Sequence, residues 1–303
     1  MDFNKIIEKH GYSEELGDFL KQIYDEFVVE FDSDYECVIF DAFYNAPILS
    51  VNNVYEGMKE HDFIVESDSD GIVNEGDLRR SSGCYSAKST ERFENGQYVL
   101  DDIKRAVFIN QLDLKKDWQK AVLIHELGHL VKAYIGEYTI NGNIKINKSG
   151  LIRSVSRIDG LNDYTLIEEK GVGLEEGLNT ALEETVTRKL VDPDYKANTY
   201  GVVCAMGNKF LELCGKEKVY KAQISGNKEE LITYFDEKYG MGSYEMFENM
   251  ADKAYELALE AFSYIFDPPK MNEAFGKVRQ IINEEYWPFV NECEKKTMSG
   301  ETR

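Results

Sequence analysis

The sequence AVLIHELGHLV, from Ala121 to Val131, places two of the chain's 4 histidines four positions apart around a glutamate. Apolar residues fill most of the other positions, and no proline interrupts the stretch. The pattern predicts a helix from about Asp117 to Tyr134. Because residues four apart lie one turn above each other on a helix, His125 and His129 would direct their imidazoles at one point in space.

The polar residues of this stretch form the HExxH arrangement of zinc peptidases. Two neutral imidazole nitrogens suit a zinc ion, and Glu126 would project beside the metal, where it can take a proton from a zinc-bound water. Gly128 costs a helix about 1 kcal/mol relative to alanine, which indicates that another backbone element packs close to that turn. The alternative is an ordinary amphipathic helix whose histidines only pack or face solvent.

A catalytic zinc site needs a third protein ligand. No histidine follows His129, which excludes the HExxHxxGxxH pattern, so an acidic residue on a second helix is expected. The stretch GLEEGLNTALEETVTRKL, from Gly173 to Leu190, is the obvious source. Glu176 is one candidate, and Glu183 lies seven residues later on the same helix face. Glu183, with Glu184, therefore stays open as an alternative.

HELGH followed by LEEGLNT resembles the gluzincin class of metallopeptidases, the thermolysin-like zincins. The resemblance implies that Glu176 is the zinc ligand, Gly177 the small residue after it, and Thr180 a polar supporting residue. Glu175 and Thr180 depart from the class, which commonly has asparagine and aspartate there. The implied fold is α+β and zincin-like, with a mixed α/β N-terminal lobe, a mainly α-helical C-terminal lobe and the active-site helix between them.

Changes of pattern divide the chain into an N-terminal α+β region, residues 1–100, and a zincin-like catalytic region, residues 101–303. In the first region, helices are predicted at about Asn4–Lys9 and Glu14–Val29, and YECVIFDAF, from Tyr35, is predicted to be extended. The second region should contain the sheet edge and HELGH helix in 101–135, hairpins in 136–170 and a helical lobe in 171–303.

Local signals refine the second region. AVFIN, from Ala106, predicts a strand, and Asn141-Gly142 between alternating runs predicts a type I′ hairpin. A second extended pair should turn at Asp159-Gly160. From Leu174 the chain is predicted to be helical, with breaks at Asp192-Pro193-Asp194, Gly215, Gly226, Gly240 and Pro268-Pro269.

Composition limits the partners of the chain. Its 303 residues are 43% hydrophobic, enough for a full core, and the formal charge of −21 would repel nucleic acid and anionic membrane surfaces. No export signal or membrane span is recognised, and the five cysteines fit reduced thiols, so a cytoplasmic location is expected. Cys84 is interpreted as a free thiol, although a thiolate there could cap a metal.

Two weaker signals concern the oxyanion and calcium. Zinc peptidases need a donor for the developing oxyanion, and Arg157, Tyr195, Tyr200 and Tyr234 are the candidates. The acidic loop Glu66–Asp77 spaces its oxygen side chains like a single EF-hand loop, which suggests a Ca²⁺ site, with an acidic surface turn as the alternative.

Together these features predict a metallopeptidase that holds one catalytic zinc at His125, His129 and Glu176 and hydrolyses peptides or proteins, with Glu126 as general base. One alternative is a zinc-dependent amidohydrolase acting on a non-peptide amide. Another is a catalytically inactive, zinc-stabilised binding or regulatory module, although such a module would have no use for Glu126.

Overall fold

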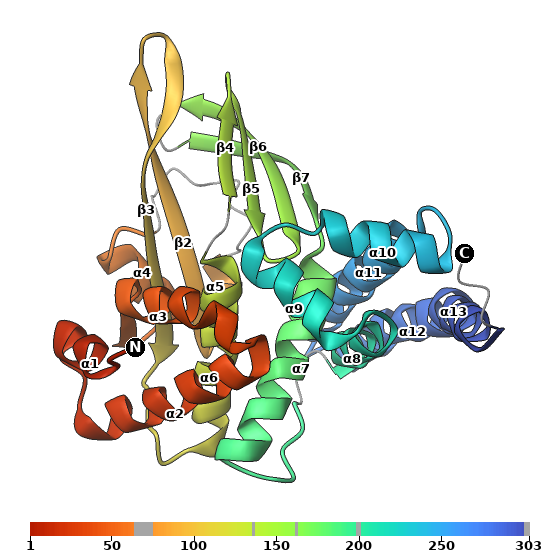
Figure 1. Cartoon of the computed structure of the whole chain (residues 1–303), viewed down its shortest axis with the longest axis horizontal. Coiled ribbons are helices and arrows are strands. Elements are labelled where there is room, and N and C mark those ends of the chain that lie inside the picture. The colour runs from red at the N-terminus through yellow and green to blue at the C-terminus, as the bar shows by residue number, and fades with distance from the viewer. Residues whose placement is uncertain (64–74, 135–136, 161–162, 198–200, 300–303) are drawn as a thin grey trace. The chain divides into compact units, whose positions relative to one another are not determined.

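The computed structural model describes residues 1–63, 75–134, 137–160, 163–197 and 201–299 (Figure 1). The chain forms two compact units. The first contains Met1–Glu169, Leu182–Lys196 and Ile224–Gly226, and the second contains Lys170–Ala181, Ala197–Gln223 and Asn227–Arg303. Helices and sheets are both present, which confirms the α+β class.

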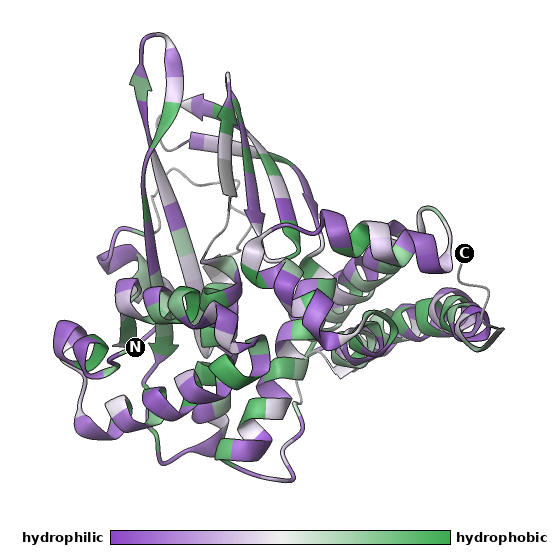
Figure 2. Cartoon of the chain, in the orientation of Figure 1, coloured by the Kyte–Doolittle hydropathy of each residue, from purple (hydrophilic) through white to green (hydrophobic). Residues whose placement is uncertain are grey.

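Three helices open the first unit: α1 (Asn4–His10), α2 (Glu14–Phe31) and α3 (Glu36–Asn45). The first two confirm the sequence predictions, and α2 turns hydrophobic and hydrophilic residues to different sides (Figure 2). The third corrects the prediction that YECVIFDAF is extended. Its aromatic and β-branched residues favour a strand locally, but Ile39, Ala42 and Phe43 recur at helical spacing and bury one face.

The first sheet consists of β1 (Ile48–Val51), β2 (Gly83–Glu94) and β3 (Gln97–Asn110). Its order is β1-β3-β2, with β1 parallel and β2 antiparallel to β3, so β2 is an outer strand. The predicted strand AVFIN is the buried end of β3, while residue 100, the predicted regional boundary, lies inside β3. Two short helices, α4 (Val54–Glu60) and α5 (Glu75–Arg80), supply Val54, Met58 and Leu78 to a core with Phe108.

The second sheet has the order β4-β5-β6-β7, made of β4 (Glu137–Asn141), β5 (Ile144–Ser149), β6 (Ile152–Gly160) and β7 (Asp163–Lys170). Both predicted extended pairs are present, but Asp159 and Gly160, the predicted turn of the second pair, lie inside β6. The first turn differs by one residue, because Asn141 pairs with Ile144 and the loop is therefore Gly142-Asn143. Gly142 has φ 64° but Asn143 does not have a positive φ, so the turn is not the predicted type I′, which needs a positive φ at both central residues.

The second unit is helical, as predicted. It contains the start of α7 (Val172–Leu190), followed by α8 (Gly201–Cys214), α9 (Lys216–Ser225), α10 (Glu229–Tyr239), α11 (Ser243–Ser263), α12 (Pro268–Ile281), the π-helical turn η2 (Ile282–Tyr286) and α13 (Trp287–Ser299). Every predicted break falls between two of these helices or at the start of one. Among the helices that the structure describes, none combines the length and apolar character that crossing a membrane requires.

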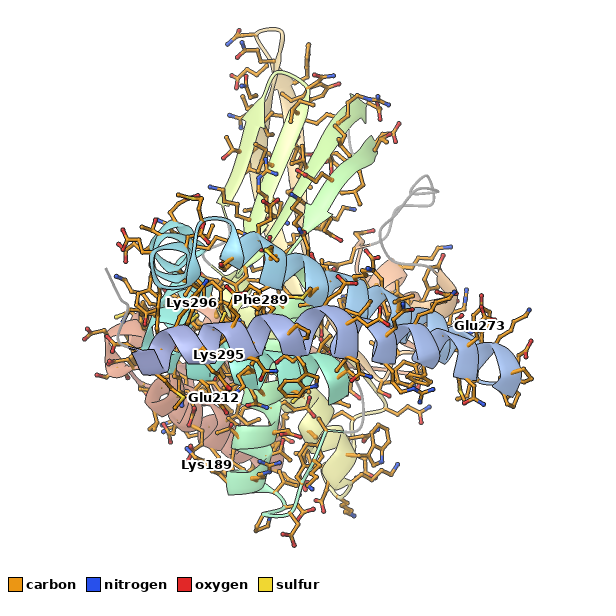
Figure 3. The ribbon with its side chains drawn as sticks, turned by 90° about the vertical axis from the view of Figure 1, so that its right-hand side faces the viewer. Lys189, Glu212, Glu273, Phe289, Lys295 and Lys296 are labelled. Atoms are coloured by element: carbon orange, nitrogen blue, oxygen red, sulfur yellow. The ribbon has the colours of Figure 1, made fainter. Side chains whose placement is uncertain are left out.

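Aromatic rings fill the core of the second unit. Phe210 of α8, Phe235 of α10 and Phe247 of α11 have centroids 5.0–6.1 Å apart. Phe289 of α13, labelled in Figure 3, lies parallel to Phe235, with 14° between the ring planes and 6.5 Å between the centroids. These ring contacts hold the helices together.

Candidate metal centre

The HELGH sequence forms most of α6 (Asp117–Ala133), close to its predicted bounds. The turn that leads into α6 from β3 is fixed by Gln119, which is buried. Its amide nitrogen donates to the carbonyls of Asn110 and Gln111 at 3.1 and 3.0 Å, and its oxygen accepts from the Asp113 amide at 2.5 Å. The side chain thereby pairs backbone groups that a buried turn would otherwise leave without partners.

One stripe of α6 carries the polar chemistry. Between Ala121 and Val131, every residue is buried except Val122, His125, Glu126 and His129, which are half-buried. These four positions recur at intervals of three, one and three and therefore lie on one face. Between Ala121 and Val131 the helix is thus enclosed by its apolar residues except along the face that carries Val122 and the three ionisable side chains.

The two histidines converge as predicted. Nε2 of His125 lies 3.1 Å from Nε2 of His129, and the ring planes are inclined by 76°. Two nitrogens bound to one tetrahedral zinc at 2.0–2.1 Å would be about 3.3 Å apart. The observed separation therefore suits a shared metal ion with little movement of either ring.

Glu183 of α7 contacts the opposite nitrogen of the first imidazole. Its Oε2 lies 2.8 Å from Nδ1 of His125, its other oxygen accepts a hydrogen bond from the Tyr195 hydroxyl, and it is buried. A carboxylate at Nδ1 favours the tautomer with the proton on that nitrogen, in which Nε2 can serve as a metal ligand. The geometry gives Glu183 a supporting position, whereas the sequence left it open as a ligand. The neighbouring Glu184 pairs with Arg188 at 3.2 Å.

Glu176 lies on the same helix. Because α7 is continuous, two turns separate Glu176 from Glu183, a distance of about 10 Å along the axis. The ligand atoms of His125, His129 and Glu176 all lie within 4.8 Å of one another, and within the described ranges these three form a group that could hold a metal ion. The Thr180 hydroxyl donates to the Glu176 carbonyl at 2.8 Å and so supports the backbone of α7, not a histidine.

The start of α7 is held tightly inside the second unit. A Cβ on Gly177 would lie 2.1 Å from the Val203 carbonyl oxygen of α8, and one on Gly173 would lie 2.2 Å from the Ala251 carbonyl oxygen of α11. These approaches explain physically why a small residue follows Glu176. The carboxylate of Asp252 accepts hydrogen bonds from the amides of Gly171 and Gly173 at 2.8 and 2.7 Å, and burial raises its pKa to about 6.

Strand β2 contacts the glutamate of the motif. The Tyr85 amide donates to Oε2 of Glu126 at 2.6 Å. At Gly83, a Cβ would lie 2.7 Å from Cγ1 of Val122 and 2.9 Å from Cγ of Glu126, so only glycine leaves room for α6 at this point. Sequence reasoning missed both contacts. The glycine in SSGCYS was the only available signal, because a main-chain donor leaves no mark in the sequence.

The candidates for the oxyanion donor have different contacts in the structure. Arg157 is half-exposed and pairs with Asp159 of its own strand at 2.5 Å. The Tyr195 hydroxyl is engaged by the glutamate at His125, and Tyr234 lies in α10, 3.3 Å from the Lys238 ammonium. Tyr200 lies outside the described residues. These contacts leave the identity of the oxyanion donor a prediction.

Two further predictions concern β2 and the segment before it. Cys84 is a free thiol that packs against the core cluster containing Phe108. Side chains alternate along a strand, so Cys84 lies on the opposite face of β2 from Gly83, which faces α6. This placement disfavours a thiolate cap on the metal. The predicted calcium loop, Glu66–Asp77, falls mostly outside the described residues.

Comparison of the chain with protein-family models, with curated proteins and with solved structures found no match. The site therefore rests on its own residues and their geometry.

Proposed function

We propose that this chain is a zinc metallopeptidase of the gluzincin type with a zincin-like fold, in which His125, His129 and Glu176 bind one zinc ion. The supporting observation is the convergence of two imidazole Nε2 atoms and one carboxylate on the half-open face of α6. Two histidines and a glutamate are a donor set of catalytic zinc sites, which keep a fourth position for water or substrate. Bound zinc would supply acidity to that water and polarise the carbonyl under attack.

The residues of the chain perform the remaining steps. Glu126 lies beside the histidine pair and accepts the proton of the attacking water, which adds to the carbonyl carbon of a peptide. Glu126 then passes the proton to the amide nitrogen as the carbon–nitrogen bond breaks, so the amine leaves neutral. Glu183 holds His125 in one orientation during both transfers.

Metal content and turnover of purified variants test the proposal together. Wild-type protein should contain zinc in a 1:1 ratio and cleave members of a peptide library. His129→Ala should lose most of the zinc, whereas His61→Ala, a change at an exposed histidine outside the cluster, should keep it. An unchanged zinc content in His129→Ala would refute the metal site.

Glu126→Gln separates catalysis from structure. An amide cannot accept the proton, so turnover should fall by at least about 10²–10⁴-fold while zinc remains bound. Full activity of this variant would remove Glu126 from the mechanism. Zinc binding without cleavage of any library peptide by the wild type would favour a non-peptide amide substrate or a binding module.

A further inference from the structure

The outer strand β2 lies against the proposed general base through its main chain. Tyr85 is opposite Val107 of β3, yet its amide donates to Oε2 of Glu126 at 2.6 Å. Hydrogen bonds of a strand alternate between its two edges, so the Tyr85 amide belongs to the edge that faces away from β3. A charge-assisted bond from a backbone amide is shorter and stronger than a neutral one.

Gly83 makes this approach possible. It lies two residues before Tyr85 and therefore on the same face of β2. A Cβ there would come within 3.0 Å of three side chains, those of Val122, Ile109 and Glu126. Two independent features of β2, the absent side chain of Gly83 and the outward amide of Tyr85, thus both contact the Glu126 side chain.

We propose that β2 is the positioning element for Glu126: Gly83 gives its side chain room, and the Tyr85 amide fixes Oε2. The inference rests on the proposed function, because it concerns the base of that reaction. The contact fixes one oxygen of the carboxylate, and with it the orientation of the Glu126 side chain. Because the donor is a backbone amide, any residue at position 85 except proline can donate this hydrogen bond to Glu126.

Tyr85→Pro removes the donor and is the direct test. Proline is tolerated on an outer strand where its missing amide faces away from the neighbour, and the extended residue before it is compatible. The matched control, Tyr85→Phe, keeps the amide. We expect Tyr85→Pro to lower kcat by about ten- to a hundredfold, with zinc content and KM close to wild type, and to lower kcat much more than Tyr85→Phe does. An unchanged kcat in folded, zinc-loaded Tyr85→Pro would overturn the proposal.

Amide hydrogen exchange tests the contact without altering the strand. In wild type the Tyr85 amide should be protected, and Glu126→Ala should speed its exchange while leaving the Val107 amide of β3 unchanged. Equal protection of Tyr85 in both proteins would also overturn the proposal. A wild type that lacks zinc or hydrolysis would refute the proposed function, and the exchange experiment would still report on the contact, so the two failures are distinguishable.

Discussion

Replacement of Glu183 by alanine measures how much the support of His125 contributes to metal binding. The carboxylate lies 2.8 Å from Nδ1 of His125, is 8% exposed and is held from its other side by the Tyr195 hydroxyl. Loss of such a partner typically lowers metal affinity by about 10–100-fold, which corresponds to about 1.4–2.7 kcal/mol. The imidazole would keep its metal-binding nitrogen but lose the bond that selects its orientation and tautomer.

The assay is competition for zinc with a chelator of known affinity, at a pH where histidine is neutral. Glu183→Ala should bind one zinc ion with the weakened affinity given above. Glu184→Ala is the matched control, since its carboxylate pairs with Arg188, and it should bind zinc like the wild type. Glu176→Gln should lose more affinity than Glu183→Ala, because it would remove a proposed donor to the metal itself.

Two outcomes would refute this reasoning. If Glu183→Ala lost zinc completely while Glu176→Gln kept it, Glu183 would be the third ligand, and the assignment along α7 would move by two turns. If Glu183→Ala bound zinc as tightly as the wild type, the contact at Nδ1 would have no part in holding the metal.

Two predictions concern stability. Gly177→Ala should destabilise the chain by several kcal/mol, since its Cβ would lie 2.1 Å from a carbonyl oxygen of α8, whereas Gly276→Ala, with open space around it, should be neutral or stabilising by about 1 kcal/mol. Urea unfolding compares the two, and equal midpoints would contradict the packing argument. Because burial raises the pKa of Asp252 to about 6, ionisation costs the folded state more than the unfolded chain. As pH rises from about 4 to 7, the wild type should lose about 2–3 kcal/mol relative to Asp252→Asn. Parallel stability profiles of these two proteins would rule this out.

Local periodicity explains which elements could be predicted from the sequence. The helix around His125 and His129, the strand at Ala106 and the breaks between the C-terminal helices are each determined by residues close in sequence. Segment 35–43 could not be predicted in this way. Its composition favours a strand, and the outcome depends on a core that receives Ile39 and Phe43 from one helical face.

The candidate site shows the same limit. Spacing indicated that His125 and His129 share a helix face. It could not decide whether Glu176 or Glu183 is the third ligand, because that depends on which part of α7 lies beside the two histidines. The role of Tyr85 was out of reach for a different reason. Its donor is a main-chain amide, which every residue except proline possesses, so no residue type marks the position.

The chain leaves the first unit after Glu169 and returns to it twice, so no single cut in the sequence separates the two units. The first unit takes Leu182–Lys196 and Ile224–Gly226 from within the second half of the sequence, and α7 contributes residues to both units. A fragment that ends at Glu169 would therefore lack the segment containing Glu183 and Tyr195, and the complementary fragment would carry that segment with nothing to pack against. A single cut at Glu169 is therefore expected to leave the first unit incomplete. The first unit is therefore complete only after translation has passed residue 226.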